Sequence, residues 1–97
     1  MTATVRIAAT IAADVYVTSI TTTRHFAAMN LSSNDDPIKI EILNSSGGYE
    51  DMKYLDGSGR PRTAILSYDN NIITLNGGDV RFSKPVTYGL VELVEYT

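Results

Sequence analysis

Residues 38–43 read Ile-Lys-Ile-Glu-Ile-Leu, with an isoleucine at every second position. An alternation with a period of two separates apolar from charged side chains across a strand, so it predicts a strand with one buried and one wet face. The same alternation recurs at residues 5–7, 15–17 and 80–82. These runs are rich in Val, Ile, Thr and Tyr, which suit a pleated sheet. The sequence therefore predicts an all-β chain.

Clusters of Ser, Asn, Asp, Gly and Pro separate the runs at roughly the spacing that sandwiches and barrels show. They occur at residues 33–37, 44–48, 56–61, 69–71 and 76–79. Asn76-Gly77 favours positive φ angles and predicts a type I′ hairpin turn, and residues 69–71 predict a short hairpin-like turn. Strands are expected at residues 3–8, 14–20, 25–31, 37–43, 62–68, 71–76, 79–83 and 86–96.

This pattern predicts a single β domain over residues 1–97, built as a small β-sandwich or barrel of about seven or eight short antiparallel strands, jelly-roll or Ig-like. Residues 1–13 are rich in both alanine and β-branched residues, and we interpret them as an extended N-terminal arm or an edge strand. Residues 44–61 form the longest interruption and could contain a short helical turn or an extra strand.

The closing run, residues 86–96, breaks its alternation between Leu90 and Val91. Gly89 lies just before the break and could mark a bulge. Alternatively, the core covers one face of this strand and a neighbouring molecule covers the other, which is the reading we favour.

Composition disfavours several classes of function. The chain has 97 residues and a net charge of −3, from 8 Lys and Arg against 11 Asp and Glu. No basic run suits a phosphate backbone or an anionic membrane, so neither is an expected partner. Cysteine is absent, which excludes disulfides and thiolate chemistry and favours folding in a reducing cytoplasm. The N-terminus does not resemble a signal peptide, and no apolar stretch approaches the ~20 residues that span a bilayer.

Little in the sequence suggests catalysis. His25 is the only histidine, and no nucleophile motif surrounds it. The adjacent carboxylates Asp35-Asp36 and Glu50-Asp51 point to opposite sides of an extended chain, so neither pair converges on a substrate. Residues 56–59 lack the further acids of a calcium loop. We therefore expect no enzymatic activity, no cofactor and no metal site.

Two segments are candidates for contact with a protein partner. Arg60 and Arg62 flank a proline and could clamp an acidic patch, with Tyr49 and Tyr54 as amphipathic anchors nearby. Val5 and Ile7 belong to the N-terminal segment, which could add a strand to the sheet edge of a neighbour. A chain this short has a thin core, so homo-oligomerisation is also expected, with a trimer as the specific guess.

Two stretches carry a resemblance to a known class of proteins. Phe26-Ala-Ala-Met-Asn-Leu-Ser-Ser33 leads through Asn34-Asp-Asp36 into Pro37-Ile-Lys-Ile40, and Leu75-Asn-Gly-Gly-Asp-Val-Arg-Phe82 precedes Pro85-Val-Thr-Tyr-Gly-Leu90. This plan is similar to that of small virion proteins of tailed phages, the head decoration or cement class, over about residues 24–43 and 73–96. The resemblance implies a small β-fold at the junctions of a capsid, with the major capsid protein as partner and the virion as location, after synthesis in the host cytoplasm. It implies no active site.

Three other classes remain open. A carbohydrate-binding or adhesin-like module would use residues 49–62 as a groove, although tryptophan, the strongest stacking residue, is absent. A tail or connector protein could have the same fold, because fold does not determine function. An enzyme has the least support, given a single histidine and scattered carboxylates.

Overall fold

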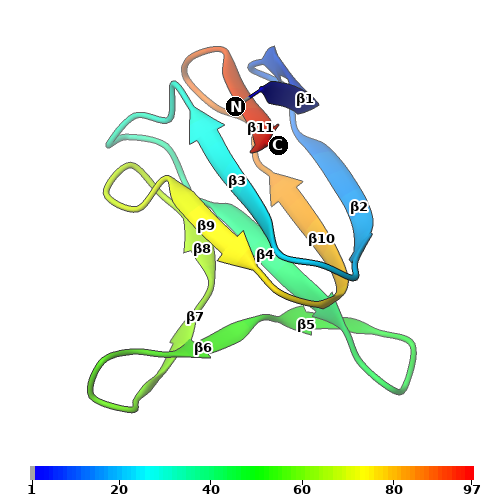
Figure 1. The fold of residues 1–97 in the computed structure, drawn as a ribbon. Helices are drawn as coiled ribbons and strands as arrows, with labels where there is room; N and C mark the ends of the chain where they lie inside the picture. Colours follow the sequence, from blue (N-terminus) through cyan, green and yellow to red (C-terminus); the bar gives the residue numbers. More distant parts are fainter. Residues whose placement is uncertain (1) are drawn as a thin grey trace.

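The chain forms two packed antiparallel sheets, seen in the computed structural model, which describes residues 2–97 (Figure 1). The described residues contain no helix that is long and apolar enough to cross a membrane. The strands are β1 (Ala3–Thr10), β2 (Asp14–Ile20), β3 (Arg24–Met29), β4 (Ile38–Leu43), β5 (Tyr49–Asp51), β6 (Lys53–Leu55), β7 (Pro61–Thr63), β8 (Ile65–Leu66), β9 (Ile72–Leu75), β10 (Gly78–Lys84) and β11 (Val91–Tyr96).

Eight of these strands pair in nested order. β1 pairs with β11, β2 with β10, β3 with β9, and β4 with β8. Pairs between β11 and β3 and between β10 and β4 join them into one sheet of order β1-β11-β3-β9 and another of order β2-β10-β4-β5, with β8 also beside β4. A long hairpin wound in this way around two sheets is the jelly roll. The predicted all-β sandwich is confirmed, and the pairing assigns it to the jelly roll and not to the Ig-like alternative.

The core is a single layer of side chains between the sheets. At its centre the rings of Phe26 and Phe82, one from each sheet, lie 4.7 Å apart between centroids, and Tyr16 lies 6.1 Å from Phe82. The largest fully buried side chains are Phe26, Phe82, Ile7, Ile38, Ile40, Leu66, Leu93, Val80 and Val91. They come from six of the strands, and those that share a strand lie at alternate positions, as the period of two predicts.

The hairpin predicted at Asn76-Gly77 is wrong. β9 lies in one sheet and β10 in the other, so Asn76-Gly77 connects two sheets and closes no hairpin. The positive φ of 103° falls on Gly78, where an added Cβ would lie 2.8 Å from Ile42 Cδ1. The segment 69–71 also connects strands of different sheets, β8 and β9, but its turn is hairpin-like as predicted, because Ser67 and Asn70 exchange backbone hydrogen bonds of 3.0 and 3.2 Å. In a jelly roll most successive strands lie in different sheets. The residues of a turn do not indicate whether the strands on its two sides pair with each other or belong to different sheets.

The ambiguous segments resolve in three ways. The N-terminal segment is the edge strand β1, although Met1 lies outside the described residues. The 44–61 loop contains the short strands β5 and β6, and the predicted strand 62–68 is divided between β7 and β8.

The closing strand begins only at Val91, and the register shifts fall in β1 and not at Gly89. On the face of β11 away from the core, Val94 is 3% exposed beside Ala27, whereas Glu92 and Tyr96 are partly exposed.

The aromatic contact between the sheets yields a first prediction. Phe82→Ala removes the ring that contacts both Phe26 and Tyr16, and we expect the free energy of unfolding to fall by about 3–5 kcal/mol. Val17→Ala, an exposed position on β2, should change it by less than about 0.5 kcal/mol. Urea denaturation followed by circular dichroism measures both. Equal, small effects of the two substitutions would contradict this account of the core.

Candidate interaction surfaces

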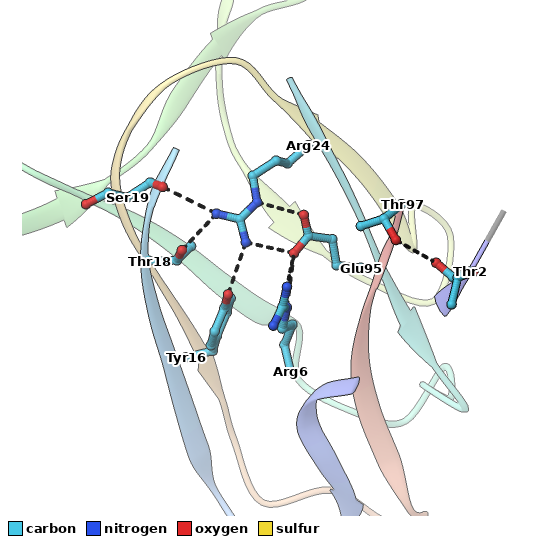
Figure 2. Close-up of polar contacts among 8 residues, drawn as sticks. All are labelled: Thr2, Arg6, Tyr16, Thr18, Ser19, Arg24, Glu95 and Thr97. Carbon is cyan, nitrogen blue, oxygen red and sulfur yellow. Dashed lines mark hydrogen bonds and ion pairs between the residues drawn. The ribbon is translucent and has the colours of Figure 1, made fainter. Parts of the chain in front are cut away.

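A network of charged side chains closes one end of the sandwich (Figure 2). The Glu95 carboxylate is almost buried and accepts two hydrogen bonds from Arg24, both of 2.7 Å, and one of 3.0 Å from Arg6 Nε. Arg24 also donates to Thr18 Oγ1 at 2.8 Å and to the Tyr16 hydroxyl at 3.1 Å. These residues come from β11, β3, β1 and β2, so the network joins both sheets.

The network is saturated with partners, which limits its chemistry. Hydrogen bonds from Arg24, outweighing the opposing effect of burial, hold the pKa of Glu95 below its usual range, and Arg6 acts in the same direction. The same carboxylate raises the pKa of Arg24. A carboxylate kept ionised by two guanidinium groups is a structural anion and a poor proton donor at neutral pH. The sequence analysis missed this network, although Glu95 shares the inward-facing positions of Val91 and Leu93 in β11.

The predicted arginine pair lies on a hairpin formed by β6 and β7, which projects below the two sheets in Figure 1 and is called the arm here (residues 53–63). Asp56 organises its turn: one carboxylate oxygen accepts the backbone N–H groups of Ser58 and Arg60, and the other accepts Arg62 Nε at 2.8 Å. These bonds, the one from Arg62 first, hold the pKa of Asp56 well below its usual range. Arg62 is therefore engaged within the chain, whereas Arg60 forms no ion pair with any described residue.

The two tyrosines of the predicted site lie in different sheets. Tyr54 is directly opposite Arg62 on the arm and is about half exposed. Tyr49 is on β5, half-buried under the Arg81 guanidinium, whose carbon lies 4.2 Å from the centre of the ring. Arg81 is held there by Glu41 at 3.1 Å. The groove beside the arm includes Tyr54 in its lining but not Tyr49.

The two contact residues predicted on the N-terminal segment, Val5 and Ile7, differ in exposure. Val5 is 54% exposed on β1, on the face away from the core, and remains available to a partner. Ile7 is 1% exposed and packs in the core, because the register shift after Val5 turns it inward opposite Leu93. The structure therefore corrects the assignment of Ile7 as a contact residue.

The end of the sandwich opposite the Glu95 network carries an exposed apolar surface. Four side chains from the β1–β2 and β10–β11 connections form it, and we call it the tip patch: Ile11 (54% exposed), Val86 (71%), Tyr88 (79%) and Leu90 (59%). The backbone joins the two connections, since Thr87 N–H donates to the Ile11 carbonyl at 2.9 Å. The prediction of a strand from residue 86 concealed this loop, although Pro85 and Gly89 both signalled irregular backbone.

Polar contacts brace the loop under the tip patch. Asp35 accepts the backbone N–H groups of both Tyr88 and Ser32 at 2.8 Å, and these bonds lower its pKa. Asn30, whose φ is 66°, donates to the Leu90 carbonyl at 3.2 Å. Thr87 is buried and donates to the Gly89 carbonyl at 2.9 Å. The apolar side chains thus project from a loop whose backbone is held by three side chains, those of Asp35, Asn30 and Thr87.

The described residues offer no group of three or more His, Asp or Glu side chains placed to hold a metal ion. The exposed His25 ring shares a hydrogen bond of 2.8 Å between its Nδ1 and Thr74 Oγ1. Comparisons with protein-family models, with curated proteins and with solved structures found no match.

The Glu95 network predicts a dependence of stability on pH. Because the pKa of Glu95 is lowered in the folded chain, its contribution is complete above the ordinary carboxyl pKa and is lost as the pH falls through the lowered value. Glu95→Gln leaves Arg24 without its anion, so we expect a loss of about 3–5 kcal/mol at neutral pH and a shallower fall in Tm below pH 5. Glu50→Gln, an exposed control on β5, should retain the wild-type profile. Parallel acid profiles of Tm for the wild type and Glu95→Gln would contradict the assignment.

Proposed function

We propose that this chain is a non-enzymatic structural protein of a phage particle, a decoration or cement protein that stabilises the head shell by binding the major capsid protein. The observation that carries the proposal is the tip patch: four exposed apolar side chains on a loop pair whose backbone is braced by Asp35, Asn30 and Thr87. The resemblance of the sequence to small virion proteins suggests the particle in which this surface would be used.

The composition of the tip patch suits a protein partner. Isolated apolar residues are common on any surface, but a contiguous apolar group rimmed by polar residues marks an interaction site. The rim here includes Asp35 and Asp36, which border the hollow beside Val86 and Tyr88. Exposed apolar side chains with acidic groups beside them follow the arrangement of an interface with an apolar core and a polar rim.

The bracing of the loop supports binding without a conformational change. Ordering a loop on association costs free energy that reduces affinity, and a loop that is already fixed avoids that cost. A protein that binds only the mature shell stabilises that form by mass action, which is what a cement protein must do. We extend the proposal to clustering of copies, with a trimer as the specific expectation, because several weak contacts on one lattice add through high effective concentration.

Co-sedimentation with heads of the chain's own source virus tests the proposal. Labelled protein is mixed with DNA-filled heads and with empty precursor shells, and bound protein is measured in the pellet. We expect saturable, stoichiometric binding to the mature heads. Tyr88→Ala combined with Leu90→Ala should weaken that binding at least tenfold, since central aromatic and apolar anchors dominate interfaces.

Leu55→Ala provides the matched control. Leu55 is 71% exposed, like the tip residues, but lies on the arm at the opposite end of the sandwich. Its substitution should leave binding within threefold of wild type. Failure to pellet with either form of head would refute the head-shell proposal, and equal effects of the tip and arm variants would refute the role of the tip patch.

A further inference from the structure

β9 forms one edge of the four-stranded sheet, with β3 on one side only. The alternation of an antiparallel ladder shows which of its backbone groups lack a partner in the sheet. Ala28 N–H donates to the Asn71 carbonyl at 2.8 Å, which makes this pair hydrogen-bonded. The next pair along the ladder, Ala27 with Ile72, is then a non-hydrogen-bonded one, and so is His25 with Thr74. The N–H and C=O groups of Ile72 and Thr74 therefore point out of the sheet.

A groove of about 560 Å³ runs along this open edge. One wall is β9 with the residues that flank it, from Asn70 to Gly77, and the other is formed by residues 52–54 and Ala64, beside the arm. The volume lies within the range of about 300–1,000 Å³ that is typical of sites that enclose a ligand. Its lining includes Ile72, Met52 and Tyr54, so apolar surface flanks the unpaired backbone groups.

The sequence of the edge strand itself offers no protection against an added strand. Natural edge strands are often protected by a lysine, a proline or a bulge. β9 reads Ile-Ile-Thr-Leu, and its pairing with β3 has no register shift. Its backbone groups are therefore ready to pair with another extended segment.

We propose that this groove binds an extended segment of a partner protein, which adds to the four-stranded sheet as a fifth strand beside β9. Unpaired backbone N–H and C=O groups at the spacing of a strand form hydrogen bonds with another extended backbone. The ligand is therefore expected to be a peptide segment in an extended conformation. The groove has walls on both sides, so it admits a lone segment and obstructs the approach of a whole sheet edge from a second copy of the chain. This site is separate from the tip patch and does not depend on the head-shell proposal.

The lining also specifies the side chains of the segment. Lys53 is the only ionisable cation among the described lining residues, and none of them is a carboxylate. The segment should carry apolar side chains at alternate positions, facing Ile73 and Leu75 at the base of the groove, and an acidic residue near Lys53. Side chains on the opposite face of the segment would remain in water.

A displayed library of random dodecapeptides tests this inference without any viral component. The wild-type protein is used to select binders, and enriched peptides are then titrated in solution. We expect peptides with alternating apolar residues to be enriched and to bind at micromolar concentrations. Amide hydrogen exchange at Ile72 and Thr74 should slow at least tenfold in the complex, while exchange along β1, the opposite edge, should not change.

Two substitutions at one position separate backbone pairing from side-chain contact. Thr74→Pro removes the outward-pointing N–H, and proline is tolerated on an edge strand where that group faces solvent. Thr74→Ala retains the N–H and, like the proline, loses the hydroxyl that bonds His25. We expect Thr74→Pro to weaken peptide binding at least tenfold and Thr74→Ala to remain within threefold of wild type.

Three outcomes would overturn the inference: no enrichment, tight binding that survives Thr74→Pro, or protection from exchange that falls outside β9. Circular dichroism establishes whether Thr74→Pro folds. If it does not fold, the exchange measurement on the wild-type complex decides alone. Because no heads are used, a failure here is distinct from a failure of co-sedimentation, and each proposal stands or falls by its own measurement.

Discussion

The contact between Phe26 and Phe82 across a single layer of side chains is what the rest of the structure depends on. A domain of this size buries only about 60–65% of the surface that its unfolded chain exposes, so it has no second apolar layer in reserve. Every inward position near the centre is accordingly apolar, and polar groups enter only where the layer ends. At one end Glu95 is neutralised by Arg24 and Arg6, and at the other the buried Lys84 ammonium donates to the Ala12 carbonyl. The core is thus closed at both ends by charged groups that have partners.

This closure explains why the exposed surfaces lie where they do. The polar groups at the tip end fix the backbone of the β1–β2 and β10–β11 connections, and the side chains of those connections are left facing water. A longer loop that packed its own apolar residues against the body would have no such surface to offer. The arm differs, because it forms a separate two-stranded sheet. An isolated hairpin is marginally stable, so the bonds that Asp56 accepts within the arm help to hold its turn.

Sequence alone predicted the elements better than their arrangement. The alternation in residues 14–20 and 38–43 gave strand bounds within one residue of those observed, because the period of two records burial directly. The nested pairing of the strands could not be predicted in this way. Ala3 lies opposite Tyr96, for example, and the residues around either one do not indicate that the two strands pair. Asn76-Gly77 was misassigned for the same reason, since a turn that is compatible with a hairpin also suits a change of sheet. Among the proposed contact residues, Arg60 and Tyr54 are exposed, whereas Ile7 is buried because of a register shift that the sequence does not show. The tip patch was not predicted, because Val86, Tyr88 and Leu90 show the alternation of a strand although they lie in a loop.

The directions of the perturbed pKa values show how the carboxylates of this chain contribute to its fold. A carboxyl that works as a general acid near neutral pH needs a raised pKa, usually from burial or from a second carboxylate. Among the described residues, the pKa values of Asp35, Glu41, Asp56 and Glu95 are all lowered, and hydrogen bonds from arginine side chains or backbone N–H groups are the leading cause. Each of these carboxylates stabilises a loop, the arm or a sheet, so its charge serves the geometry of the surface around it. These ionised groups therefore fix the backbone beneath the exposed surfaces. That is the property on which binding through the tip patch and through the edge of β9 would depend.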